Sequence, residues 1–223
     1  MSRKDDVQIA EVVRNAIIFN INNWGEAVMK TDNLFEAVER LFALLEEREV
    51  DYLLVGGIAL LKYVEGRNTD DIDLIMTLDS LRNLPEIEVR SEDEDFVSGQ
   101  FGNLKIDVLL TQNKLFDKVR CQHATKLQFG EREIPCATVE GLLLLKLYAL
   151  PSLYRQGKFA RVNLYEGDIA ALLEAYETDL EPLFEELSFH LSVTDIESLH
   201  EIVREIEQRL TRFRNGLESS PPG

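Results

Sequence analysis

The stretch that decides the fold is VGGIALLKYVEGRNTDDIDLIM, residues 55–76, in which three aspartates stand directly before or within an apolar run. Unpaired carboxylates are costly to bury, so their position needs a chemical reason. DIDLIM, residues 71–76, has the composition of a buried strand, as does YLLV at residues 52–55. Between them, a Gly-Gly pair introduces a helix expected over residues 58–66. The predicted order is strand, glycine turn, helix and strand.

Outward from this stretch, the chain is expected to begin with helices. Apolar residues recur at helical spacing over residues 7–20 and 34–48, and Asp32 and Asn33 are suited to cap the second helix. LKIDVLLT, residues 104–111, reads as another buried strand.

The middle of the chain completes a sheet. Residues 91–100, SEDEDFVSGQ, read as a polar connection, and residues 113–120 as a short helix. ATKLQFGEREIPCA, residues 124–137, has the pattern of a hairpin that turns near Gly130. These segments together predict a short mixed sheet with few helices.

From Thr138, which is suited to cap a helix, the pattern is helical to about Arg214. The predicted helices contain residues 139–150, 165–177 and 195–213. We therefore expect an α/β (α+β) fold with four regions: an N-terminal helical segment at 1–49, a core at 50–137, a C-terminal helical part at 138–214 and a disordered tail at 215–223.

Composition limits the classes of function. The formal net charge of −17 argues against a broad electrostatic grip on nucleic acid, so no stable DNA binding is expected and a polyanionic substrate must be held locally. The two cysteines and three histidines show no metal-ligand spacing, which indicates a reduced, cytoplasmic protein without structural zinc. The N-terminus lacks the apolar core of a signal peptide, and the apolar run at residues 141–150 is too short to span a bilayer, so no membrane association is expected.

The aspartates predict a metal site. Asp71 and Asp73 stand at positions i and i+2 of a strand, so both side chains point to one face. Two unit charges about 4 Å apart repel by roughly 4 kcal/mol at an effective dielectric constant near 20, so the pair needs a shared proton or a cation. Asp107 stands between apolar neighbours in LKIDVLL, and three carboxylates converge if its strand lies beside DIDLIM. Such a group can hold two Mg²⁺ or Mn²⁺ ions for phosphoryl transfer. Asp70 is interpreted as a solvated neighbour.

The glycine turn and the residues before the aspartates predict a phosphate site. Gly56 and Gly57 lack side chains between a strand and a helix, where a phosphate can approach the backbone. Arg67 and Thr69 could add a cation and a hydroxyl to a triphosphate site. The pattern is not a P-loop, because no GxxxxGK[ST] is present.

Gly-Gly, a helix, D-x-D on a strand and a lone aspartate on a later strand resemble the nucleotidyltransferase superfamily related to DNA polymerase β. Within it, GG…GRNTDDIDLIM is similar to the AbiEii-like group, which includes the MenT toxins and has the approximate pattern R-x-T-x-D-x-D. TVEGLLLLKLYAL and YEGDIAALL resemble the downstream helices of that group. This resemblance implies a nucleotidyltransferase fold, contact of Lys146 with nucleotide phosphates, and Asp168 as a further active-site acid.

The residues and the resemblance together predict a metal-dependent nucleotidyltransferase, which moves a nucleoside monophosphate from an NTP to an acceptor hydroxyl. The resemblance implies a toxin that acts on tRNA and has a cognate antitoxin. Two alternatives stay open: nucleotidylation of a protein partner, as in antitoxins that modify a toxin, and a module that only binds a nucleotide or a partner. The acidity favours a protein acceptor slightly, because such an acceptor needs no broad basic surface.

Overall fold

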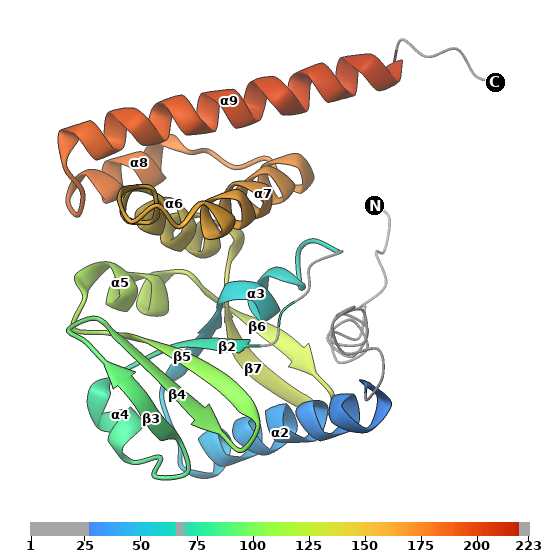
Figure 1. The fold of residues 1–223 in the computed structure, drawn as a ribbon, viewed down its shortest axis with the longest axis vertical. Coiled ribbons are helices and arrows are strands. Elements are labelled where there is room, and N and C mark those ends of the chain that lie inside the picture. The colour runs from blue at the N-terminus through green and yellow to red at the C-terminus, as the bar shows by residue number, and fades with distance from the viewer. Residues whose placement is uncertain (1–26, 66–68, 70, 219–223) are drawn as a thin grey trace. The chain divides into compact units, whose positions relative to one another are not determined.

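The computed structural model describes residues 27–65, 69 and 71–218, and the chain divides into two compact units between Thr138 and Val139 (Figure 1). The helix predicted over residues 7–20 lies outside the described residues. Over the described residues the structure is a mixed α/β fold, as predicted, with a seven-stranded sheet and eight helices. The sheet lies entirely in the first unit, and the second unit is helical.

The sheet has the strand order β3-β4-β5-β2-β1-β7-β6. β1 is antiparallel to β2 and parallel to β7, whereas β2 is parallel to β5, so the sheet is mixed as predicted. The outer pairs β3–β4, β4–β5 and β6–β7 are antiparallel. The bounds are β1 Tyr52–Val55, β2 Asp71–Met76, β3 Glu88–Glu92, β4 Phe96–Phe101, β5 Leu104–Leu110, β6 Ala124–Phe129 and β7 Arg132–Ala137.

Four helices belong to the first unit: α2 Ala27–Glu47, α3 Gly56–Leu60, α4 Leu78–Arg82 and α5 Lys114–Gln122. Figure 1 shows α2 and α5 on opposite sides of the sheet. Phe42 of α2 packs against the rings of Tyr52 and Phe129, with ring centroids 6.2 and 5.2 Å away. On the other side, Phe116 of α5 meets Phe96 of β4 edge to face. Both faces of the sheet are therefore covered at least in part.

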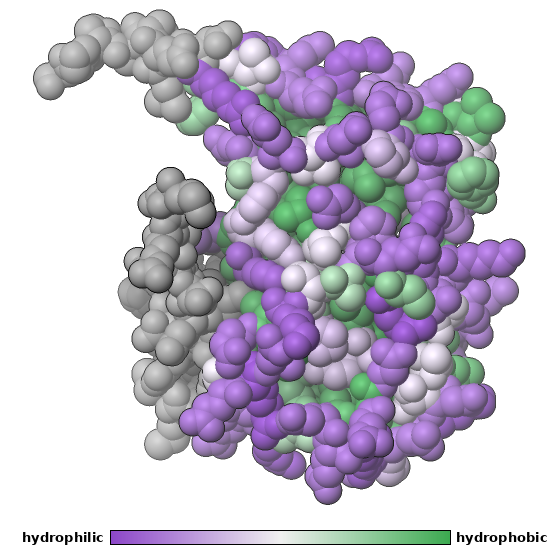
Figure 2. All heavy atoms as spheres, turned by 180° about the vertical axis from the view of Figure 1, so that it is seen from behind, coloured by the Kyte–Doolittle hydropathy of each residue, from purple (hydrophilic) through white to green (hydrophobic). Residues whose placement is uncertain are grey.

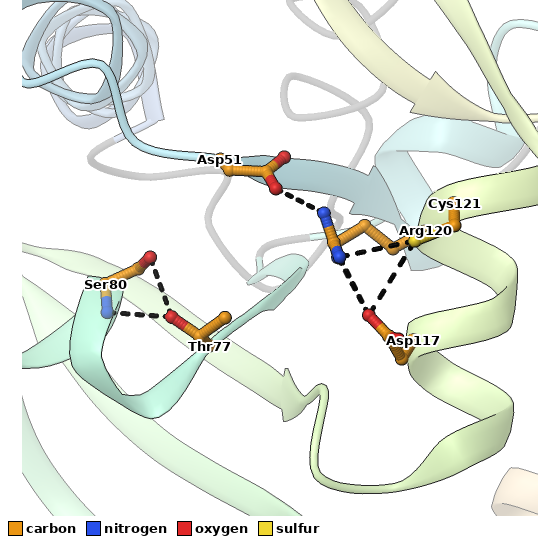
Figure 3. A network of polar contacts seen from close by, with 6 residues as sticks. All are labelled: Asp51, Thr77, Ser80, Asp117, Arg120 and Cys121. Carbon is orange, nitrogen blue, oxygen red and sulfur yellow. Dashed lines mark hydrogen bonds and ion pairs between the residues drawn. The ribbon is translucent and has the colours of Figure 1, made fainter.

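Polar contacts fix α5 and α4 to the strands (Figure 3). The guanidinium of Arg120 on α5 forms an ion pair with Asp51, directly before β1, and another with Asp117 at 2.8 Å. Thr77 caps α4, because its hydroxyl oxygen accepts a hydrogen bond from the backbone N–H of Ser80 at 3.0 Å. The contact with Asp51 joins α5 to the start of β1, and the cap at Thr77 stabilises the first turn of α4, directly after β2.

The second unit consists of α6 Val139–Arg155, α7 Phe159–Ala175, α8 Glu181–Ser188 and α9 Val193–Glu218. α6 contacts each of the other three helices. Its leucines at 142, 143, 144, 147 and 150 are at most 1% exposed, which explains why this helix is so apolar. Gly157 forms the turn into α7 with a φ of 66°, a left-handed conformation that suits glycine.

Several predicted boundaries are wrong. α2 begins at Ala27, so Asp32 and Asn33 lie inside the helix rather than at its start. α3 ends at Leu60, earlier than predicted, and is followed by a turn. The segment read as a polar connection at residues 91–100 instead completes β3 and forms most of β4. In FVSGQF every second residue is buried, which is the pattern of a strand with one face on the core.

The helical elements of the second unit are longer than predicted. α6 continues to Arg155, and α7 begins six residues before Tyr165. α9 reaches Glu218, beyond the helix predicted to end at residue 213. Residues 219–223 lie outside the described residues.

Charged and polar side chains cover most of the face seen in Figure 2, and apolar side chains gather there only in small groups. At one edge of the sheet, all five residues of β3 are exposed, among them Glu88, Arg90 and Glu92. Of the helices in the described part of the chain, none combines the length and the apolar character needed to cross a membrane.

The two cysteines are predicted to differ sharply in reactivity. Cys136 is completely buried, and burial raises the pKa of its thiol to about 12, whereas Cys121 is exposed. We expect the disulfide reagent DTNB to modify one thiol per chain rapidly in the native protein at neutral pH, and two in denaturant. Cys121→Ser should abolish the fast phase. Rapid native modification of Cys136 would contradict its place in the core.

Candidate active site

Two parallel strands place the aspartates of the first unit on one face of the sheet. β2 and β5 pair in the register Asp71 with Lys105 and Asp73 with Asp107. Directly paired residues point to the same face, as do residues i and i+2 of one strand. All four side chains therefore share a face, while Ile72 and Leu74 are fully buried on the other. The strand of Asp107 does lie beside DIDLIM, which is the condition under which the three carboxylates were expected to converge.

Lys105 joins two of these carboxylates. Its Nζ lies 2.8 Å from Oδ2 of Asp107 and 3.4 Å from Oδ2 of Asp71. The second oxygen of each carboxylate accepts a hydrogen bond from a hydroxyl: Oδ1 of Asp107 from Ser98 at 2.7 Å, and Oδ1 of Asp71 from Thr69 at 2.8 Å. Each carboxylate is thus held at one oxygen by a hydroxyl and directs the other toward the same ammonium group.

The charge of Lys105 is maintained by these contacts. Partial burial acts to lower the pKa of its ammonium group, but the hydrogen bond and charge of Asp107, with the charge of Asp71, outweigh burial. The pKa of Lys105 is therefore raised above its usual value, and this site holds a cation at neutral pH. The side chains of Asp71 and Asp107 are about one-quarter exposed and that of Lys105 about one-half, so solvent reaches all three.

Asp73 has a different neighbour, the first residue of α3. A Cβ atom at Gly56 would lie 1.8 Å from Oδ2 of Asp73 and 2.4 Å from its Cγ. Gly56 also has a φ of 65°, which side chains of L-residues rarely adopt. Glycine is therefore required here twice, by the backbone conformation and by the close approach of the carboxylate. Gly57 is buried in the same helix.

The donor set suits a divalent cation, but two of its three carboxylates are paired with Lys105. Three carboxylates on adjacent strands offer the oxygen ligands that Mg²⁺ and Mn²⁺ prefer, and two of them already converge on one positive atom. Across the described residues, however, no group of three His, Cys, Asp or Glu side chains could hold a metal ion in its present arrangement. The donor types fit the metal site predicted from the sequence, although their present arrangement does not form it.

The other predicted site residues fall into three groups. Arg67 lies outside the described residues, as does Asp70, which was interpreted as a solvated neighbour and not as a site residue. The hydroxyl of Thr69, predicted to meet a triphosphate, donates to Asp71 and so orients that carboxylate. Lys146 and Asp168 belong to the second unit, on α6 and α7.

Lys146 and Asp168 form a buried ion pair. Nζ of Lys146 lies 2.7 Å from Oδ2 of Asp168, and the two residues are only 4% and 6% exposed. The ammonium group also lies 4.6 Å from the ring centroid of Tyr165, within range of a cation–π interaction. The two residues that the family resemblance selected are therefore brought together, 22 positions apart in the chain.

Sequence reasoning missed Lys105 and Ser98. Lys105 could have been found, because it precedes Asp107 by two residues in a predicted strand and therefore shares its face. Ser98 pairs with Asp107 across β4 and β5, but its segment was not recognised as a strand.

The carboxylate face is not part of the hollow, of about 680 Å³, that lies between α2 and the turn after β4. That hollow is lined by Arg40 and Phe101 among other residues, and by none of the aspartates. We place the candidate site at the aspartates, because charge and hydrogen bonding are concentrated there.

No family model matches the chain, and no curated protein matches it by sequence. Among solved structures, it resembles an antigenic nucleotidyltransferase-like protein from Paracoccidioides brasiliensis, with 17% identity, a TM-score of 0.55, and coverage of 81% of this chain and 91% of that one. The antibiotic-resistance factor ANT(2″)-Ia also matches, at 14% identity and a TM-score of 0.47, with coverage of 83% and 98%. The crystal structure of ANT(2″)-Ia in complex with adenylyl-2″-tobramycin matches at 13% identity and a TM-score of 0.43, and the match covers 77% of this chain and 95% of that one.

The first of these likenesses shows that the fold is that of nucleotidyltransferase-like proteins, as the resemblance of the sequence implied. It does not identify the AbiEii-like group within that superfamily.

Replacement of Gly56 separates backbone strain from collision with Asp73. Gly102, in the turn between β4 and β5, has a φ of 61°, and a Cβ atom added there would meet nothing within 4 Å. Gly102→Ala should lower the free energy of unfolding by roughly 1–2 kcal/mol, the cost of a left-handed L-residue. Gly56→Ala should lower it by roughly 1–3 kcal/mol more, because the methyl group also displaces Asp73. If Gly56→Ala and Gly102→Ala lower the free energy of unfolding equally in urea denaturation, the carboxylate of Asp73 does not lie close enough to Gly56 to collide with a methyl group.

The ion pair in the second unit should show strong coupling in a double-mutant cycle. Lys146→Met leaves the carboxylate of Asp168 buried without its cation, which typically costs about 3–5 kcal/mol of stability. Adding Asp168→Asn to this variant should cost much less than Asp168→Asn does alone, a coupling of roughly 1–3 kcal/mol in urea denaturation. As a control, Lys126→Met removes an exposed pair with Glu133 and should change stability by less than about 1 kcal/mol. Additive losses at Lys146 and Asp168 would contradict the pairing.

Proposed function

We propose that this chain is a metal-dependent nucleotidyltransferase, which transfers a nucleoside monophosphate from an NTP to an acceptor hydroxyl. The observation that supports it most is the register of β2 and β5, which sets Asp73 opposite Asp107 and directs oxygens of Asp71 and Asp107 to one cationic point. A nucleotidyltransferase-like fold around these residues agrees with the proposal.

In the proposed reaction, the acceptor oxygen attacks the α-phosphorus of the NTP. A new oxygen–phosphorus bond forms, the bond from the α-phosphorus to the oxygen bridging it to the β-phosphate breaks, and pyrophosphate leaves with that oxygen. The proton of the hydroxyl passes to solvent. The task of the protein in such a transfer is to position the reactants and to balance the negative charge.

Asp71, Asp73 and Asp107 would hold two Mg²⁺ or Mn²⁺ ions. When bound, these ions supply Lewis-acid chemistry, which neutralises phosphate charge and favours ionisation of the acceptor hydroxyl. Thr69 and Ser98 orient the carboxylates of Asp71 and Asp107, respectively, by donating hydrogen bonds to them. Gly56, Gly57, Arg67 and Thr69 are proposed to position the phosphates.

For the acceptor, we propose tRNA, following the AbiEii-like resemblance, with a cognate antitoxin as partner and a cytoplasmic setting. The net charge of −17 favours a second candidate, the hydroxyl of a protein partner, because electrostatic attraction to RNA is weak for such a chain. A module that binds a nucleotide without transferring it is the third candidate, and the presence of all three aspartates on one face argues against it.

Label transfer to total cell extract tests the proposal. The protein is incubated with each of the four NTPs, labelled with ³²P at the α position, in the presence of Mg²⁺ or Mn²⁺. We expect a labelled RNA band in the size range of tRNA, absent with Asp71→Ala/Asp73→Ala, because that variant lacks two of the three carboxylates. A labelled protein band would identify the second candidate.

Thermal melting with NTP, with and without divalent ions, is the control if the label-transfer assay shows no labelled band. An enzyme should be stabilised by NTP in a metal-dependent way, as expected for a ligand that binds only the folded state. If neither labelling nor stabilisation occurs with any NTP, the proposed function is wrong.

A further inference from the structure

The residues around Lys105 fix the position of its ammonium group. The β2–β5 register sets it directly across from Asp71 and two residues before Asp107 on the same face. Its ammonium group contacts both carboxylates, and the hydroxyls of Thr69 and Ser98 hold the opposite oxygens of those carboxylates. An ordinary surface ion pair needs only one carboxylate and no such orienting groups.

The ammonium group contacts carboxylate oxygens for which a divalent ion at this site would compete. A metal ligated by Asp71 and Asp107 would use the oxygens that now contact Nζ, since the other two oxygens accept hydrogen bonds from hydroxyls. A lysine ammonium group within contact distance of a divalent ion would be strongly repelled. Lys105 and the ion therefore exclude one another.

Lys105 is able to move away. Its side chain is 49% exposed and has a flexible four-carbon stem, so the charged end can turn into solvent without unfolding the strand. Once displaced, the ammonium group needs another anionic partner, and a nucleoside triphosphate at the site supplies one.

We propose that Lys105 is a displaceable resident cation, which holds the carboxylates together before substrate arrives and competes with the divalent ion for Asp71 and Asp107. It is a positioning residue, and it makes metal binding depend on the nucleotide: the ion alone binds weakly, and the ion together with an NTP binds well. This inference rests on the function proposed above.

Mn²⁺ titration in the absence of nucleotide tests the proposal, with free Mn²⁺ measured by electron paramagnetic resonance. Lys105→Met keeps the length of the side chain and removes its charge, so we expect Mn²⁺ to bind about tenfold more tightly than to the wild type. Lys105→Arg keeps the charge and should bind as weakly as the wild type. The gain in Lys105→Met should persist at high salt, because displacement at contact distance is screened much less than long-range attraction.

Thermal melting gives an independent readout. Without metal, Lys105→Met should melt below the wild type, because the carboxylates then repel one another, and Mn²⁺ should raise its melting temperature more than that of the wild type. Addition of NTP should tighten Mn²⁺ binding in the wild type more than in Lys105→Met.

Two results would overturn the inference in different ways. If the wild type and Lys105→Met bind Mn²⁺ equally well, and Asp107→Asn abolishes binding in both, the metal site stands and the role of Lys105 is refuted. If none of these proteins binds Mn²⁺, with or without NTP, the metal site itself is absent and the proposed function fails with it.

Discussion

Mutual repulsion of carboxylates on neighbouring strands is the constraint on which the first unit depends. The parallel register of β2 and β5 fixes Asp71, Asp73 and Asp107 on one face of two neighbouring strands. The surroundings compensate for this in three ways: an ammonium group between two carboxylates, hydroxyl donors from Thr69 and Ser98, and the missing side chain of Gly56 beside the third. Partly buried clusters of charged side chains of this kind are more typical of functional sites than of residues that only stabilise a fold.

The strands and carboxylates could be predicted from the sequence because period-two alternation is a local property. DIDLIM and LKIDVLL show their buried faces and their charged positions within a few letters, and the structure places both where that alternation requires. The groups that orient the carboxylates depend on which strands become neighbours, which is set by the whole sheet. Ser98 illustrates the difference, since only its pairing with Asp107 gives it a role, and the acidic run before it conceals the strand.

Helix boundaries were harder to predict than helices, for a related reason. Capping residues such as Asp32 and Asn33 stabilise a helix start by only about 1 kcal/mol, which continued helical structure can outweigh. In the second unit, packing among four helices extends α6, α7 and α9 beyond the segments with a clear apolar period. The family resemblance selected Lys146 and Asp168 but did not predict their pairing, because a lysine in a leucine-rich helix gives no local indication of its partner.

The exposed edge of the sheet at β3 affects how copies of this chain meet at high concentration. An unpaired strand edge can template the addition of a strand from another molecule, the first step toward aggregation. Two copies of Glu88–Glu92 aligned antiparallel about their central residue would set Arg90 against Arg90 and Glu88 against Glu92. Like charges directly opposite one another destabilise such a pair. The order of charged residues along β3 therefore disfavours pairing of this edge with the same strand of a second copy.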